Sequence, residues 1–241
     1  MKEILIKGQL YKFKTFAEFA EEFRLGSDDL ILTNEFIYQP FMKELNLDCQ
    51  IVFQEKFGAG EPSEEMITDI FSAIKPESFQ RIIAVGGGAI MDIGKVLSLK
   101  RTGSVHDLYF KKAEAVPEKE LIAIPTTCGT GSEVTNISVA IVHDDNGNTT
   151  KLGLVSDLLI PSSVCLIPEM LKTLPYGPFA SSAIDALIHA VESYLSPARA
   201  TMTSELYGVK AMELILEGFR RIRDEGKDAR FGYFDEFITA S

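Results

Sequence analysis

Residues 81–98 read RIIAVGGGAIMDIGKVLS, and this stretch decides the fold. A short apolar run is typical of a buried strand, three glycines follow it, and apolar residues then recur at helical spacing. Such a strand–glycine–helix unit belongs to βαβ folds, in which parallel strands alternate with helices. Two roles are open for Gly86, Gly87 and Gly88. They let the backbone approach a pyrophosphate at the helix N-terminus, or they only form a tight turn.

The same alternation of strands and helices extends upstream of the glycine turn. Apolar runs at 29–34 and 49–54 predict two more strands, and the first residues predict an opening strand or hairpin. Between them we expect a helix that Thr15 caps and Gly26 ends, and a later helix that Ser63 caps. This pattern predicts a parallel, doubly wound α/β sheet.

Helical periodicity takes over from about Glu169. We therefore expect an α/β domain over residues 1–168 and an all-helical domain over 169–241. The last predicted helix opens at Asp228 and stops at Ser241 without a capping glycine or a polar tail. The helical domain is thus expected to be incomplete.

Composition excludes several classes of function. The net charge is −11 and no Lys/Arg cluster forms a stripe, which argues against nucleic-acid binding. No apolar run approaches the roughly 20 residues of a membrane span, so we expect a cytoplasmic protein. Three scattered cysteines, Cys49, Cys128 and Cys165, are expected to be reduced and structural.

Residues 121–160 are rich in strand-forming residues and include a hairpin with the turn DDNGN. Within them a second unusual stretch, IPTTCGTGSEVTN at 124–136, follows a predicted strand. It offers hydroxyls and backbone donors to a polar ligand, or it is an elaborate helix cap around Ser132 and Glu133. Because open α/β sheets bind ligands where such loops leave the strands, the ligand interpretation is favoured.

A third stretch, IDALIHAVESYLS at 184–196, places Asp185 and His189 one helical turn apart. Side chains four residues apart share a helix face, so both can reach one metal ion. On spacing alone, a buried hydrogen-bonded pair that stabilises the helix is the favoured alternative.

The three stretches, in this order, resemble the iron-containing (group III) alcohol dehydrogenases, and within them the 4-hydroxybutyrate dehydrogenase branch. The resemblance implies a Rossmann-like N-terminal domain and a helical C-terminal domain, the dehydroquinate synthase-like architecture. It also implies NAD(P), a divalent metal in the cleft and a dimer or larger homo-oligomer.

Site residues follow from the same resemblance, position by position. The implied metal ligands are Asp185 and His189, and two further histidine ligands are expected downstream of this chain. His106 and His143 are interpreted as solvated loop residues, and Lys95 as a solvated or salt-bridged residue that could reach phosphate. The implied cofactor residues are Gly87, Gly88 and Ala89 at the pyrophosphate, Asp92 and Val139 at the nicotinamide, Thr126, Thr127, Thr130 and Thr135 in the cofactor loop, and Lys151 and Asn34 at the riboses.

Two of these positions depart from the family pattern. Ala89 stands where serine is usual, and Asn34 stands where an aspartate commonly binds the adenosine ribose. Without that carboxylate the argument against a 2′-phosphate weakens, so NAD is favoured and NADP stays open.

The expected reaction is hydride transfer between NAD(P) and a small primary alcohol or aldehyde, such as 4-hydroxybutyrate and succinic semialdehyde. Four ligands of this kind suit Fe(II) or Zn(II). The sequence identifies no catalytic acid or base beyond the metal ligands. The alternatives are an inactive nucleotide-binding chain, or another branch such as glycerol, propanediol or butanol dehydrogenase.

Overall fold

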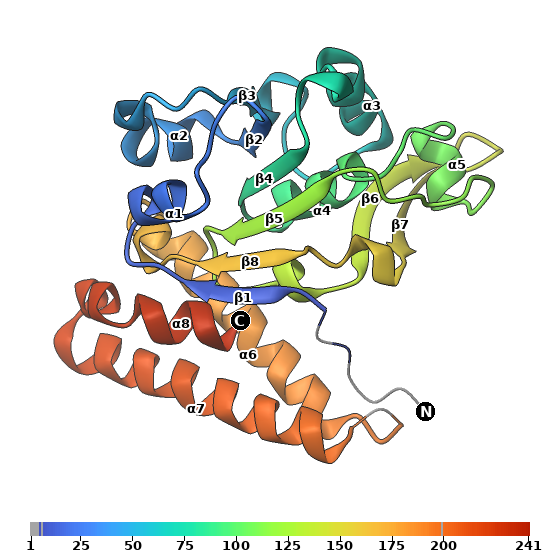
Figure 1. The fold of residues 1–241 in the computed structure, drawn as a ribbon. Helices are drawn as coiled ribbons and strands as arrows, with labels where there is room; N and C mark the ends of the chain where they lie inside the picture. The colour runs from blue at the N-terminus through green and yellow to red at the C-terminus, as the bar shows by residue number, and fades with distance from the viewer. Residues whose placement is uncertain (1–4, 6, 199) are drawn as a thin grey trace.

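A parallel sheet forms the centre of the computed structural model, which describes residues 5, 7–198 and 200–241. Its six strands lie in the order β1-β8-β5-β4-β2-β3, and each neighbouring pair is parallel. An antiparallel hairpin, β6 with β7, stands apart from it (Figure 1). The strands are β1 (Gln9–Lys12), β2 (Asp29–Thr33), β3 (Gln50–Phe53), β4 (Arg81–Gly86), β5 (Glu120–Pro125), β6 (Ile137–His143), β7 (Thr149–Val155) and β8 (Ser163–Leu166).

Successive residues of each strand face opposite sides of the sheet, so a separate core forms on each side. Leu30 and Leu32 of β2 join the core beneath α3 and α4, whereas Ile31 between them joins the core with α1 and α2. This explains why the central strands are apolar without alternation, as parallel strands covered on both faces usually are. The helices of this α/β region are α1 (Phe16–Glu22), α2 (Glu35–Phe41), α3 (Glu64–Ala73), α4 (Gly88–Leu97) and α5 (Val105–Tyr109).

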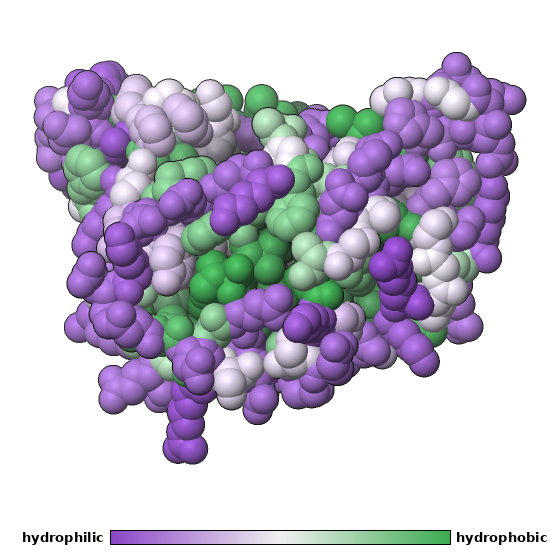
Figure 2. Space-filling view, turned by 90° about the horizontal axis from the view of Figure 1, so that it is seen from above, coloured by the Kyte–Doolittle hydropathy of each residue, from purple (hydrophilic) through white to green (hydrophobic). Residues whose placement is uncertain are grey.

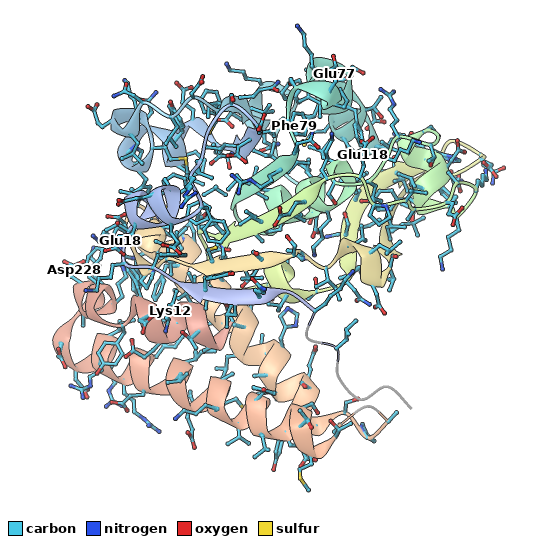
Figure 3. All side chains as sticks on the ribbon, in the orientation of Figure 1. Lys12, Glu18, Glu77, Phe79, Glu118 and Asp228 are labelled. Carbon is cyan, nitrogen blue, oxygen red and sulfur yellow. The ribbon has the colours of Figure 1, made fainter. Side chains whose placement is uncertain are left out.

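Three helices follow the sheet and pack beneath it (Figure 1). They are α6 (Tyr176–Leu195), α7 (Met202–Glu225) and α8 (Phe234–Ala240). Their shared core includes Phe179 and Phe237, whose rings meet edge to face at 4.8 Å, and Val164 of β8. Lys12 of β1 lies toward α8 (Figure 3), where its ammonium group pairs with Asp235 at 2.7 Å. The helical region is therefore joined to the sheet by apolar packing and by a surface ion pair.

Most local sequence predictions are confirmed. Thr15 caps α1 by accepting from Glu18 N, and Ser63 caps α3 by accepting from Met66 N. The Rossmann-like sheet with helices, followed by a helical region, has the predicted fold class. Residues 1–4 and 6, which belong to the predicted opening strand or hairpin, lie outside the described residues, and the remainder forms the single strand β1.

Three local predictions are wrong. Helix α1 ends at Glu22, four residues before Gly26, because Arg24 adopts the left-handed conformation that reverses the chain. The four-residue strand β8 is absent from the prediction because so short an apolar run shows no periodicity. At Asp228 the chain forms a 3₁₀ helix, and the final α-helix starts only at Phe234.

The molecular surface is mainly polar on the face shown in Figure 2. Figure 2 shows one face that is hydrophilic over most of its area, with hydrophobic residues gathered in a central hollow. Among the residues that the structure describes, no helix has the length and apolar character of a membrane span.

Candidate cofactor and metal site

The glycine turn connects β4 to α4 at the carboxyl edge of the sheet. Gly86 ends the strand, and its carbonyl accepts a hydrogen bond from Thr126 N at 3.0 Å. A Cβ on Gly86 would lie 2.4 Å from Ile90 Cγ1, so this position requires glycine for packing alone. Gly87 is the N-cap residue of α4 and has no side chain with which to cap the helix. The first N–H groups of α4 are thus available to an anion.

The threonine loop, residues 124–136, lies directly against this turn. A Cβ on Gly87 would lie 3.4 Å from Thr127 Cγ2, and one on Gly88 would lie 3.1 Å from Thr130 Oγ1. Thr130 is exposed, whereas Thr127, Gly87, Gly88 and Ala89 are half-buried. Two motifs that are distant in the sequence therefore form one surface of glycine backbone and threonine hydroxyls.

Asp92 fixes the end of this loop to α4. One carboxylate oxygen accepts from Ser132 Oγ at 2.6 Å, and the other accepts from Val139 N at 3.1 Å. The predicted role of Asp92 near the nicotinamide remains a prediction. Its observed contacts position Val139, another predicted cofactor residue, at the start of β6.

Lys95, also in α4, holds the threonine loop through further hydrogen bonds. Its ammonium group donates to Ser132 Oγ at 2.8 Å, to Thr135 Oγ1 at 2.9 Å and to Ile137 O at 2.6 Å. It also lies 3.6 Å from Asp92 Oδ1, so the expected salt bridge is present. The expected exposure to solvent is wrong, because the side chain is buried beneath the loop and holds it in place.

Burial shifts the pKa of two groups at this point. Burial lowers the pKa of Lys95 to about 8, and the carboxylates of Asp92 and Glu133 oppose that shift. Burial also raises the pKa of Glu133, which lies in the short 3₁₀ turn of the loop. A short 3₁₀ turn does form at Ser132–Val134, but no side chain caps it, so the alternative interpretation of this stretch as a helix cap is wrong.

Helix α6 brings the predicted metal ligands to the other side of the loop. A Cβ on Gly129 would lie 3.0 Å from Ser182 Cβ, so the threonine loop contacts α6 there. Ser182, Asp185 and His189 follow one another at helical spacing and share a face. His189 Nε2 is 3.5 Å from Asp185 Oδ2, and the two side chains are 56% and 49% exposed. The alternative of a buried structural pair is wrong, since both groups face solvent.

An oxygen and an imidazole donor at this separation fit two positions of an Fe(II) or Zn(II) site. In the described residues, no group of three or more His, Cys, Asp and Glu side chains is close enough to hold a metal ion. His106 and His143 do not join the pair. His106 lies in α5 and stacks on Phe110, and His143 ends β6 with Nε2 2.9 Å from Glu65. Both thus belong to regular elements and not to the expected loops.

The two predicted ribose residues lie on different elements: Asn34 follows β2, the strand that pairs with β4 and its glycine turn, and Lys151 lies on β7. Lys151 Nζ, on β7, pairs with Glu61 at 2.7 Å on the surface. Asn34 precedes α2 and donates through Nδ2 to Gln54 Oε1 at 3.1 Å and to Glu55 Oε2 at 2.8 Å. Sequence reasoning identified neither Glu55 nor the loop-holding role of Lys95. The spacing of Lys95 from Asp92 was the only available signal for the second.

One of the three cysteines, Cys128, lies in the threonine loop, where its Sγ is 3.6 Å from Ser182 Oγ of α6. All three are free, and burial raises the pKa of Cys49 and Cys128 to about 11 and that of Cys165 to about 12. The absence of disulfides among them agrees with the predicted reduced state, and the raised pKa values favour the thiol over the thiolate at neutral pH.

Sequence comparison identifies the origin of these motifs. A model of the iron-containing alcohol dehydrogenases matches residues 9–168, and a model of the C-terminal region of the Fe-containing alcohol dehydrogenase family matches residues 179–241. The chain belongs to the iron-containing alcohol dehydrogenase family. Among its members, a 4-hydroxybutyrate dehydrogenase from Clostridium kluyveri is 48% identical over all 241 residues. The chain spans 64% of the length of that relative.

Solved structures of iron-containing alcohol dehydrogenases share the fold. One from Thermotoga maritima has a TM-score of 0.78 at 24% identity, covering 100% of this chain and 68% of its own. A sulfoacetaldehyde reductase from Bifidobacterium kashiwanohense, solved in complex with NAD+, has a TM-score of 0.79 at 21% identity and covers 100% and 66%. At these identities the likeness establishes the fold alone.

Proposed function

We propose that the chain supplies the cofactor site and two metal ligands of a metal-dependent oxidoreductase that transfers hydride between NAD(P) and a small primary alcohol or aldehyde. The observation that carries this proposal is the direct contact between the glycine turn and the threonine loop, with α6 packed on the same loop. In this arrangement the backbone proposed to bind phosphate, the threonine hydroxyls and the helix that carries Asp185 and His189 surround one edge of the sheet. Ligands of open α/β folds bind at this edge.

Each group has a defined role in the proposal. The backbone N–H groups of Gly88 and Ala89 donate to the pyrophosphate, aided by the N-terminal dipole of α4. Hydroxyls of the threonine loop orient the nicotinamide end, and Val139 lines it. Asp185 and His189 hold the metal. When bound, NAD(P) supplies the hydride carrier and the metal supplies a Lewis acid for the substrate oxygen.

The substrate that we propose is 4-hydroxybutyrate, with succinic semialdehyde as its oxidised form. Support comes from the 48% identity to the Clostridium kluyveri relative, which extends over the whole chain. We also propose a homo-oligomer in the cytoplasm, and a division into a nucleotide-binding domain at 1–168 and a metal-binding domain at 169–241.

A chimera tests the function directly. The 241 residues are joined to the C-terminal third of the Clostridium kluyveri protein, and NAD+ reduction is measured with 4-hydroxybutyrate and with methanol, after loading with Fe(II) or Zn(II). We expect turnover with 4-hydroxybutyrate in preference to methanol. Gly88→Val, which fills the contact with Thr130, should abolish nucleotide binding.

Two results would contradict the proposal in different ways. A well-folded chimera that binds NAD+ without any turnover would leave only the inactive nucleotide-binding alternative. Equal turnover of methanol and 4-hydroxybutyrate would overturn the substrate and retain the reaction.

A further inference from the structure

Polar side chains follow two neighbouring strands, β2 and β3, at the edge of the sheet where the nucleotide is proposed to bind. Strands β2 and β3 are parallel and in register, with Thr33 opposite Phe53. The residues that follow the two strands, Asn34 after β2 and Gln54 and Glu55 in the 3₁₀ turn after β3, therefore lie together. Asn34 donates its amide to both partners, and its 2.8 Å contact with Glu55 Oε2 is within the range of charge-assisted bonds.

Glu55 is held firmly although it is exposed. Its other oxygen, Oε1, accepts from the backbone N–H of Glu35 at 2.6 Å. Gln54, which is buried, donates to Gly58 O at 3.0 Å and so fixes the residue before Glu55. Each carboxylate oxygen has capacity for a further hydrogen bond. A ligand hydroxyl can thus bind this carboxylate without breaking the contacts that hold it.

The role that we infer for Glu55 depends on its position relative to the glycine turn. The turn follows β4, the strand next to β2, and β3 lies immediately beyond. In dinucleotide-binding sheets, the adenosine ribose extends from the pyrophosphate across the end of the adjacent strand, where a carboxylate accepts from its hydroxyls. Here that strand ends in Asn34, which is uncharged. The neighbouring carboxylate is Glu55, one strand further out.

The charge around Glu55 is not balanced by a nearby ion pair in the described residues. The adjacent cation, Lys56, lies over the ring of Phe53 at 5.0 Å from its centroid. Asn34 satisfies one carboxylate oxygen without neutralising it. A negatively charged group brought against Glu55 would therefore meet an uncompensated carboxylate, whereas a hydroxyl would find an acceptor.

We propose that Glu55, positioned by Asn34, binds the adenosine ribose hydroxyls and excludes a 2′-phosphate, making the site selective for NAD over NADP. The inference rests on the proposed function, because it presumes nucleotide at the glycine turn. It assigns a specificity residue to the 3₁₀ turn Gln54–Lys56 that follows β3, and it resolves the choice of cofactor that Asn34 leaves open.

Ligand binding to the 241-residue chain tests this inference without catalysis. Titration calorimetry is carried out with ADP-ribose and with 2′-phospho-ADP-ribose on the parent, Glu55→Gln, Asn34→Asp/Glu55→Gln and the control Glu77→Gln. Glu77 is an exposed carboxylate beside the amino end of β4, remote from the glycine turn (Figure 3). Glutamine keeps the shape of Glu55 and removes its charge.

The expected result is a change in selectivity. Loss of one charge-assisted bond should weaken ADP-ribose binding by roughly tenfold in Glu55→Gln, while the phosphorylated ligand gains affinity. Asn34→Asp should restore the preference for ADP-ribose in the double variant, because it returns a carboxylate to the end of β2. Glu77→Gln should behave as the parent.

Two outcomes separate this inference from the proposed function. If the parent binds ADP-ribose and Glu55→Gln keeps the ratio of the two affinities, Glu55 is only a structural acceptor and the inference is overturned alone. If the folded parent binds neither ligand, nucleotide binding itself fails, and the inference fails with it.

Discussion

Lys95 Nζ and Ser132 Oγ are 2.8 Å apart, with the lysine side chain entirely out of contact with solvent. A buried ammonium is costly unless it is fully bonded, and here it donates to two hydroxyls of the threonine loop and to the carbonyl of Ile137 at the start of β6. The contact joins the helix that begins with the glycine turn to the loop that covers it. Lys95 is therefore a positioning residue for the candidate cofactor site.

Replacing Lys95 with Met should destabilise the protein and loosen the loop. The change leaves Asp92 and Ile137 O without their buried donor, which should lower the free energy of unfolding by about 2–3 kcal/mol. Urea denaturation measures this loss, with Lys172→Met as a control because Lys172 is 61% exposed. A Lys95→Met protein as stable as the parent would show that the loop does not depend on this contact.

The buried lysine also predicts a dependence of stability on pH. Burial lowers the pKa of Lys95 from 10.5 to about 8, so between these values the unfolded chain holds a proton that the folded chain has released. Stability rises with pH wherever the unfolded state binds more protons. Below pH 8 Lys95 is protonated in both the folded and the unfolded state, so the full free-energy cost of burying its charge lowers the stability.

The stability difference between the parent and Lys95→Met should accordingly grow from pH 8 to pH 10.5, by up to roughly 3 kcal/mol. Urea unfolding of both proteins at matched pH isolates this group, because all other titrations are shared. A difference that stays constant over this range would mean that Lys95 titrates as it does in water.

Asp185→Ala and His189→Ala should abolish metal binding with little effect on folding. Both side chains are about half exposed and their mutual contact is a surface pair, worth at most about 1 kcal/mol. Metal content of the purified chimera, measured by mass spectrometry, should fall at least tenfold in either variant. Glu192→Gln is the matched control, since Glu192 lies 3.9 Å from the other imidazole nitrogen. Retention of metal in both alanine variants would remove the pair from the ligand set.

Local structure was easier to predict from the sequence than the side-chain contacts of the site. The glycine turn, the Thr15 and Ser63 caps and the hairpin could be predicted because each depends on residues within a few positions of one another. The burial of Lys95 depends on acceptors 37 to 42 positions away, and no periodic pattern reports such a contact. The same holds for Glu55, which meets Asn34 only because β3 pairs with β2.

Gly218→Ala should destabilise the helical region, although alanine normally stabilises a helix relative to glycine. A Cβ on Gly218 of α7 would lie 2.4 Å from Phe237 Cζ, and that ring is fixed against Phe179 in the core. The expected cost is about 1–3 kcal/mol, the range for overpacking, and it outweighs the gain of about 1 kcal/mol in helix propensity.

Thermal unfolding measures the cost of Gly218→Ala, with Gly177→Ala in α6 as the control, because no atom lies within 4 Å of the Cβ added at Gly177. Gly177→Ala should be neutral or slightly stabilising. If the two variants shifted Tm equally and upward, α7 and α8 would not pack in solution as closely as the structure shows, and the helical region would be a looser assembly.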